Sequence, residues 1–138
     1  MGSIARATHH QHQTFVRGQV LYNSPAAATG IIIGHIPMGA LLSSIDVTVM
    51  TAQNAGTTNT VSIGLIPETN GILSTPPAAQ SNLVAAAPAG AVAFTKNAPT
   101  AANVYCATDM AVVMSLAQSG TAATAGAVTA VVTYTPNL

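Results

Sequence analysis

The chain has 138 residues, of which 4% are charged, and its formal net charge is zero. An ordinary soluble domain has about 25% charged residues, so Thr, Ser, Asn, Gln, Gly and Ala must cover most of this surface. The composition argues against a nucleic-acid partner, because neutralising phosphates needs several basic side chains on one face and the whole chain has 3 Lys and Arg. A nearly neutral surface also resists association poorly, which favours an assembled working state.

The first 13 residues differ in composition from the rest of the chain. They contain Arg and His side chains with little apolar periodicity, and so predict an extended arm, residues 1–13, ahead of a single domain, residues 14–138. They lack the apolar stretch of a secretory signal, and no run approaches the roughly 18 apolar residues of a membrane helix. We therefore expect neither export nor a membrane partner. We expect contacts with a partner protein through Arg6, His9, His10, His12, Phe15 and Arg17.

Strand signals recur through the domain. Three segments alternate apolar and polar residues with a period of two, which is typical of a strand with one buried and one exposed face. The residues predicted to point into the core include Val47, Val49, Val61, Ile63, Val128 and Val132. Less regular strands are predicted at residues 14–22, 30–36, 91–95, 103–108 and 110–118.

Turn residues separate these strands, and helix signals are nearly absent. Asn54-Ala55-Gly56 follows one strong strand, and Asn70-Gly71 is a typical turn dipeptide after the next. The Ala-rich residues 85–93 contain Pro88 and Gly90, so we expect irregular or edge structure there rather than a helix. The pattern predicts an all-β, single-domain antiparallel β-sandwich. The chain has one cysteine and no Trp, which counts against a true immunoglobulin domain. The pattern leaves strand order open, and a jelly roll is favoured through the resemblance described below.

The chain offers few residues for catalysis. Its three carboxylates, Asp46, Glu68 and Asp109, are isolated in the sequence, and we expect each to be solvated. Cys106 lies in an apolar segment, where a lone Cys is more often a small core residue than a nucleophile. His35 ends an apolar run, and we interpret it as a hydrogen-bonded structural histidine near a sheet edge. We predict no catalytic residue.

The histidines of the arm are a candidate metal site. A biological zinc site has three or four ligands held by a fold, whereas the arm offers His9, His10 and His12 with no Cys or acid beside them. A partner contact is therefore favoured over a metal. No Gly-rich phosphate-binding motif occurs either. We expect no metal and no cofactor.

Several strand and turn segments of the domain form a recognisable set. They are residues 36–40 (IPMGA), 54–64 (NAGTTNTVSIG), 104–105, 120–121, 124–126 and 132–137 (VTYTPN). Together they resemble small jelly-roll decoration or cement proteins of tailed bacteriophage heads, of the short-tailed type. The similarity spans most of residues 36–138, and the arm is not part of it. The resemblance implies a virion protein, made in the host bacterial cytoplasm, that sits on the outer capsid surface over junctions between major capsid subunits.

The expected function is structural. Such a protein would reinforce the contacts between major capsid subunits, and we expect it to form a homo-oligomer, with a dimer favoured over a trimer because twofold symmetry is commonest. The main alternative is a carbohydrate- or receptor-binding sandwich of a phage fibre or cell-surface appendage, although scarce aromatic residues count against a sugar site. A small enzyme is the third interpretation, and the residues above give it little support.

Overall fold

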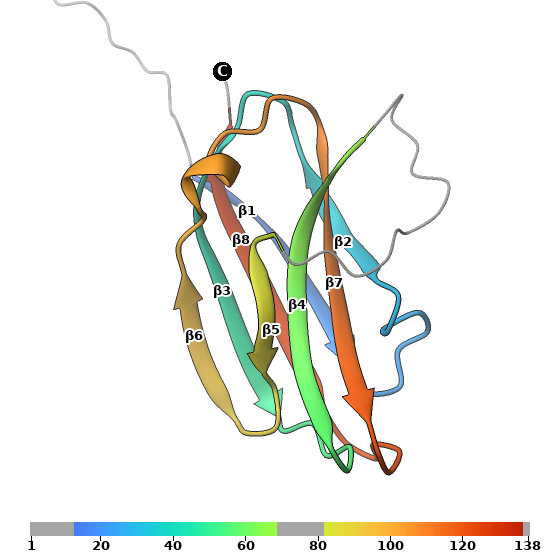
Figure 1. The fold of residues 1–138 in the computed structure, drawn as a ribbon. Coiled ribbons are helices and arrows are strands. Elements are labelled where there is room, and N and C mark those ends of the chain that lie inside the picture. The colour runs from blue at the N-terminus through green and yellow to red at the C-terminus, as the bar shows by residue number, and fades with distance from the viewer. Residues whose placement is uncertain (1–12, 69–81, 137–138) are drawn as a thin grey trace, which may run out of the picture.

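The computed structural model describes residues 13–68 and 82–136, and within them the chain is almost entirely β-structure (Figure 1). Among these residues no helix has the length and apolar character needed to cross a bilayer. The elements are β1 (Thr14–Leu21), β2 (Ile31–Ile36), β3 (Leu41–Thr51), β4 (Thr58–Pro67), β5 (Val84–Pro88), β6 (Ala93–Asn97), the short 3-10 helix η1 (Ala101–Asn103), β7 (Met110–Ser119) and β8 (Ala127–Thr135).

The strands pair as one long hairpin that has been rolled up. β1 pairs with β8, β2 with β7, β3 with β6 and β4 with β5, all antiparallel. Two further pairings, β3 with β8 and β4 with β7, complete two four-stranded sheets. Sheet A has the order β1-β8-β3-β6 and sheet B the order β2-β7-β4-β5. Two sheets connected in this way form a jelly roll, so the predicted β-sandwich is confirmed.

The core lies between the two sheets and is built from alternate residues of their strands. All six residues predicted to point inward are buried, with at most 2% of their surface exposed. Burying a Val or Ile side chain contributes roughly 1.5–3 kcal/mol relative to leaving it exposed. At one edge the sheets approach so closely that a Cβ on Gly18 would lie 2.3 Å from the Ile33 side chain. Glycine is therefore required where β1 passes β2.

One predicted strand is wrong. Residues 103–108 form no strand: they follow η1 and cross the end of the sandwich, with a single bridge between Tyr105 and Leu41. The reason is tertiary, since this segment makes isolated contacts with the β2–β3 turn and the first residues of β3 instead of extending a sheet. Cys106 N donates to Ala40 O, and Leu42 N donates to Val104 O. The other predicted strands are present, with β6 two residues later than expected. The Asn70-Gly71 turn lies outside the described residues.

Candidate functional site

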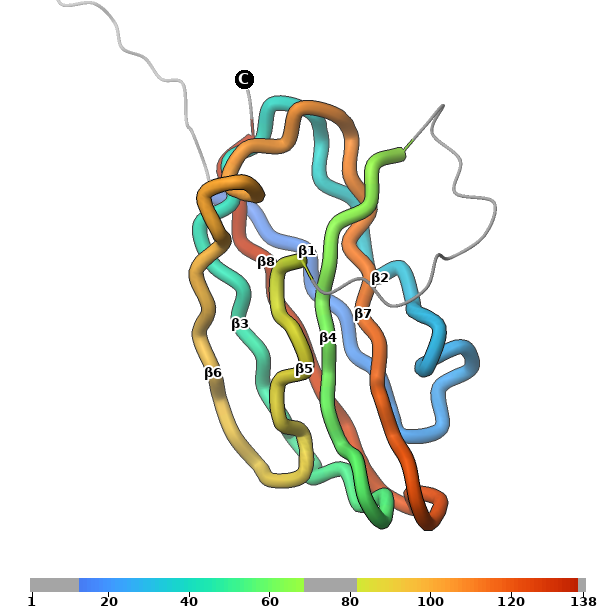
Figure 2. Tube along the Cα trace, in the orientation of Figure 1, coloured from blue at the N-terminus to red at the C-terminus, as the bar shows by residue number. Residues whose placement is uncertain are grey.

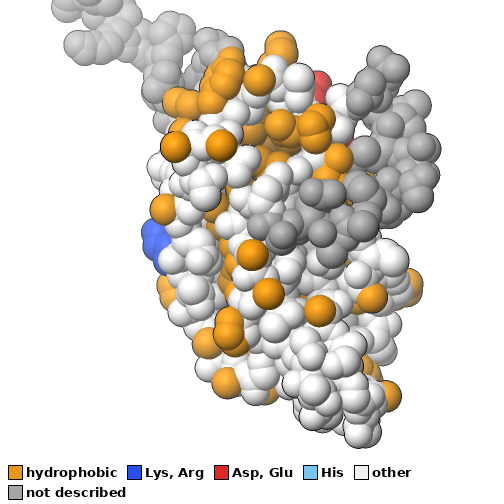
Figure 3. All heavy atoms as spheres, in the orientation of Figure 1, with side chains coloured by type: hydrophobic (Ala, Val, Ile, Leu, Met, Phe, Trp, Pro, Cys, Tyr) orange, Lys and Arg blue, Asp and Glu red, His pale blue; other side chains and the backbone are white. Residues whose placement is uncertain are grey.

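Large apolar side chains that remain exposed are concentrated on one sheet and one end of the molecule. None of those in the described residues belongs to a strand of sheet B, whose side of the molecule faces the viewer in Figure 3. Five lie on strands of sheet A, and the other three lie in loops. They are Phe15, Leu21, Leu41, Met50 and Phe94 on the strands, and Met38, Val92 and Tyr105 in the loops.

Strand register places both Phe residues of sheet A on its outer face, whereas Tyr134 on β8 belongs to the core. Val16 points into the core, so its neighbour Phe15 points outward, and the exposed fraction of Phe15 is 62%. Phe94 pairs with Thr48, whose neighbours in β3 are core residues, and Phe94 is 65% exposed. The sequence has two Phe residues, so both are presented on this face. Aromatic residues and Met are enriched in protein interfaces, which makes this face a candidate protein-binding surface.

A row of charged residues crosses the middle of the same face. Arg17 pairs with Val131, Val131 with Asp46, and Asp46 with Lys96. Arg17 and Lys96 are the Lys and Arg side chains of the described chain, so its permanent positive charge gathers here. Asp46 points outward, as predicted, and is half-buried, but one of its carboxylate oxygens is buried without a hydrogen-bond partner among the described residues. A buried polar atom of this kind requires a donor.

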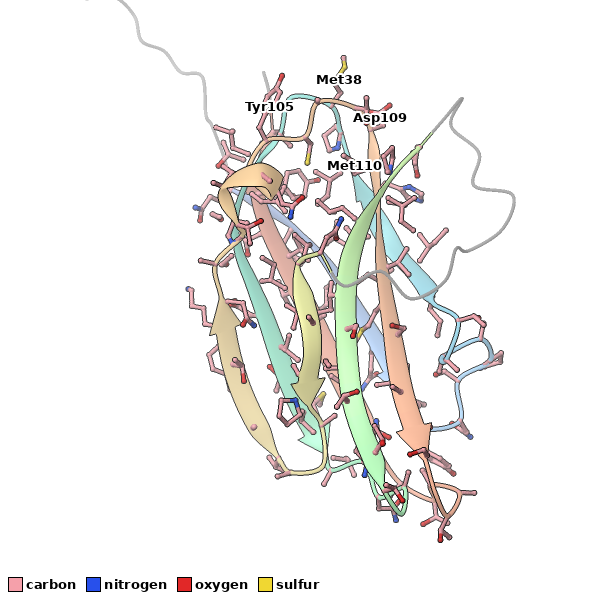
Figure 4. All side chains as sticks on the ribbon, in the orientation of Figure 1. Met38, Tyr105, Asp109 and Met110 are labelled. Atoms are coloured by element: carbon pink, nitrogen blue, oxygen red, sulfur yellow. The ribbon has the colours of Figure 1, made fainter. Side chains whose placement is uncertain are left out.

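The second apolar surface is the tip, formed by the β2–β3 turn and the segment before β7. Gly39 N donates to Cys106 O at 2.7 Å, and Leu42 N donates to Val104 O at 2.8 Å. These bonds hold Met38 and Tyr105 at the end of the sandwich (Figure 4), where they are 61% and 57% exposed.

Two of the carboxylates also support the tip: Asp109 is exposed, as expected, whereas the Glu68 side chain is only 10% exposed. The Asp109 carboxylate accepts a hydrogen bond from Met38 N at 2.8 Å, and Asp109 O accepts one from Glu68 N at 2.8 Å. The Glu68 carboxylate contacts the ring of His35 on β2. His35 is therefore a hydrogen-bonded residue on an edge strand, as predicted, whereas Asp109 and Glu68 have structural partners. The tip is thus a fixed platform rather than a loose loop.

Cys106 has the environment of a core residue, which confirms its interpretation. It is fully buried behind the tip. Burial raises the pKa of the Cys106 thiol, because the charged thiolate would lose its hydration. The thiolate is the nucleophilic form, so this environment opposes nucleophilic chemistry. Within residues 13–68 and 82–136, no three His, Cys, Asp or Glu side chains come together in a way that could hold a metal ion.

The structure brings together two of the six predicted partner-binding residues. Phe15 and Arg17 both lie on the outer face of sheet A. Arg6, His9, His10 and His12 lie outside the described residues. Sequence reasoning missed the other exposed apolar residues of this face and of the tip. The strand alternation did contain a signal, because large apolar residues stand at outward positions beside core residues.

The fold is shared with chains of three phage capsids. No protein-family model and no curated protein matches the sequence. A chain in the capsid of Ralstonia phage GP4 matches with a TM-score of 0.65 at 19% identity, over 100% of this chain and 92% of that chain. A chain in the cyanophage Pam1 capsid asymmetric unit matches with a TM-score of 0.62 at 16% identity, over 99% and 94%. The acidic stable capsid of Helicobacter pylori bacteriophage KHP30 contains a third, with a TM-score of 0.59 at 17% identity, over 91% and 89%. Each match spans nearly the whole of both chains.

Proposed function

We propose that this protein is a structural component of a phage capsid, and more specifically a decoration or cement protein on the outer surface of the head. The observation that carries the proposal is the whole-chain likeness to chains of three phage capsids, each covered over at least 89% of its length. The charge-poor composition supports it, because uncharged polar surfaces can be buried against a partner without the desolvation cost of charges.

The tip is the surface proposed to dock on the major capsid protein. Its exposed Met38 and Tyr105 offer apolar area, which contributes about 25 cal/mol per Å² removed from water. Asp109 and the hydrogen bonds behind the tip hold these side chains in place, which limits the entropy lost on docking. A protein that binds the assembled shell stabilises it by mass action, and repetition over a symmetric lattice adds avidity.

The proposed role is non-enzymatic and needs no cofactor. It is supported by the buried, protonated Cys106 thiol and by the structural contacts of Glu68 and Asp109. A binding module of a phage fibre or cell-surface appendage is the competing role. The match to capsid chains over at least 89% of their lengths favours the capsid.

The proposal is tested with capsids of the encoding phage prepared without this protein. The purified protein is added back, and the bound fraction is measured by co-sedimentation. We expect Met38→Ser combined with Tyr105→Ser to weaken binding at least tenfold, since buried anchors of this kind commonly contribute over 1.4 kcal/mol. Ala117→Ser, on the outer face of sheet B, is the matched control and should bind as the wild type does.

Two outcomes would contradict different parts of this proposal. If the wild-type protein does not bind the capsids, the capsid role is wrong. If the double variant keeps a native circular dichroism spectrum and binds normally, the capsid role stands but the tip is not the docking surface.

A further inference from the structure

A pocket lies at the end of the sandwich opposite the tip. Figure 2 shows that the end where β3 and β7 begin, which carries the tip, is opposite the end where β1, β3 and β7 finish. The pocket is at the latter end, because its lining residues finish or follow these three strands. Its volume is about 320 Å³, which falls within the range of small-molecule sites. The pocket is lined by Tyr22, Asn23, Ala55 and residues 118–123.

The loops around the pocket are fixed to one another. The Asn54 side chain donates to Thr124 Oγ1 at 2.9 Å and accepts from the backbone N atoms of Thr124 and Ala125 at 2.8 and 3.0 Å. Gly56 N donates to Thr121 O at 3.0 Å. A ligand would therefore enter a site that is largely formed in advance, which lowers the ordering cost of binding.

The lining residues suit an uncharged polar ligand. None of them is Asp, Glu, Lys, Arg or His, so the pocket offers no charge to hold a phosphate, a carboxylate or an amine. Gln118 Nε2 donates to Gln53 Oε1 at 2.7 Å, which leaves the Gln118 carbonyl and a second N–H available. The side chains of Tyr22, Asn23 and Thr121 make no hydrogen bond to another described side chain or backbone group and add further donors and acceptors.

A buried amide beside the pocket also lacks a partner. Gln53 is 2% exposed, and its Nε2 has no hydrogen-bond partner among the described residues. Its other amide atom is bonded to Gln118, a lining residue. Buried amide groups are nearly always satisfied by protein, water or ligand. This second observation indicates that polar molecules belong at this end of the fold.

We propose that this pocket binds a neutral carbohydrate, a monosaccharide or disaccharide. The Tyr22 ring supplies an apolar face for the C–H surface of a sugar ring, and the amide and hydroxyl groups of Asn23, Gln118 and Thr121 supply hydrogen bonds for its hydroxyls. The site does not rest on the proposed capsid role. If the tip docks on a capsid, however, the pocket at the opposite end faces away from the shell, toward glycans in the surroundings.

The test is an NMR titration of the intact chain with glucose, galactose, mannose and N-acetylglucosamine, each alone. We expect at least one sugar to bind in the millimolar range typical of small ligands, with shifts confined to the amides of Tyr22, Asn23 and residues 118–123. Glucuronic acid, a charged sugar, should bind no more tightly. Thr121→Val removes a hydroxyl with little change in shape and should weaken binding at least fivefold, as should Gln118→Ala.

Ala85→Ser, at an exposed position of β5 outside the pocket lining, is the control and should bind sugar normally. The proposal is overturned if no sugar causes shifts localised at the pocket, or if both Thr121→Val and Gln118→Ala bind as the wild type does. Because Gln118 contacts a buried side chain, its variant can fail to fold. In that case the result for Thr121→Val decides. The sugar titration and the co-sedimentation with capsids measure different surfaces. A negative result in the sugar titration therefore contradicts the pocket proposal without contradicting the capsid role.

Discussion

Single core residues test the strand register most directly. Ile63 on β4 is fully buried between the sheets, next to Ser62, which points to the outer face and accepts a hydrogen bond there from Ala86 N. Ile63→Asp would bury a carboxylate with no cation near it, at a cost large enough to prevent folding. We expect no cooperative thermal transition by circular dichroism. Thr60→Asp, a half-exposed position on the same strand, should still fold. A folded Ile63→Asp variant would contradict the assigned register.

Cys106 links stability to pH at the residue scale. Burial raises the pKa of its thiol above the ordinary value of 9.0, so the unfolded chain loses this proton at a lower pH than the folded chain does. The contribution of the Cys106 thiol to the free energy of unfolding is therefore fully present below pH 9.0, and it is lost as the pH rises through the pKa of the folded state. In urea unfolding across this range, Cys106→Ala should lose less stability than the wild type. Equal losses in both proteins would contradict this assignment.

At the scale of elements, the edge strand β5 explains why residues 85–93 were predicted to form irregular or edge structure rather than a helix. β5 pairs with β4 through a register shift between Val61 and Ile63, and Ala86 has a positive φ of 45°. Pro88 is the last residue of the strand and has no N–H to donate. A short, irregular edge ending in proline is a poor template for another strand. The irregular backbone and the proline that rule out a helix there also keep other strands from pairing with this edge of sheet B.

β1 begins at the end of the sandwich that carries the tip, since Thr14 pairs with Tyr134 and Tyr134 pairs with Leu42 at the start of β3. The predicted arm, residues 1–13, precedes β1 in the sequence. We predict that deleting residues 1–13 leaves the sandwich folded but weakens capsid binding in the co-sedimentation assay. Lowering the pH through about 6.5 should add positive charge at His9, His10 and His12, and so tighten binding of the full chain to an acidic partner. Unchanged affinity after truncation would make the arm a passive tail.

At the scale of the whole molecule, the outer face of sheet A predicts self-association. We propose a homodimer through this face, because its exposed apolar residues and charged row suit a protein contact and twofold symmetry is commonest. A second copy brings Arg17 and Lys96, whose side chains can donate to the unsatisfied Asp46 oxygen. Light scattering should give a dimer mass for the wild type and for Ala117→Ser, and a monomer mass for Phe15→Ser combined with Phe94→Ser. A wild type that stays monomeric across the micromolar range would contradict the dimer.

The sequence by itself determined the strands, the core and the sandwich class. Alternation with a period of two is a local property, so Val61, Ile63 and Val132 could be assigned to the core without knowing which strands pair. The arm at residues 1–13 and its contacts stay predictions from composition. The failed strand at residues 103–108 shows the limit of this reasoning, because apolar residues there cap the end of the sandwich.

Only the tertiary structure decided the strand order, the tip, the segregation of exposed apolar residues and the pocket. Each of these depends on contacts between residues far apart in the chain. Asp109 accepts from the backbone of Met38 across 71 residues, and Asn54 bonds to Thr124 across 70. Local alternation says which side chains point outward, but not whether sheet A or sheet B carries them or which loops meet. The strand order, the tip and the pocket all follow from the nested pairing of β1 with β8, β2 with β7, β3 with β6 and β4 with β5. This pairing brings residues from opposite ends of the sequence together.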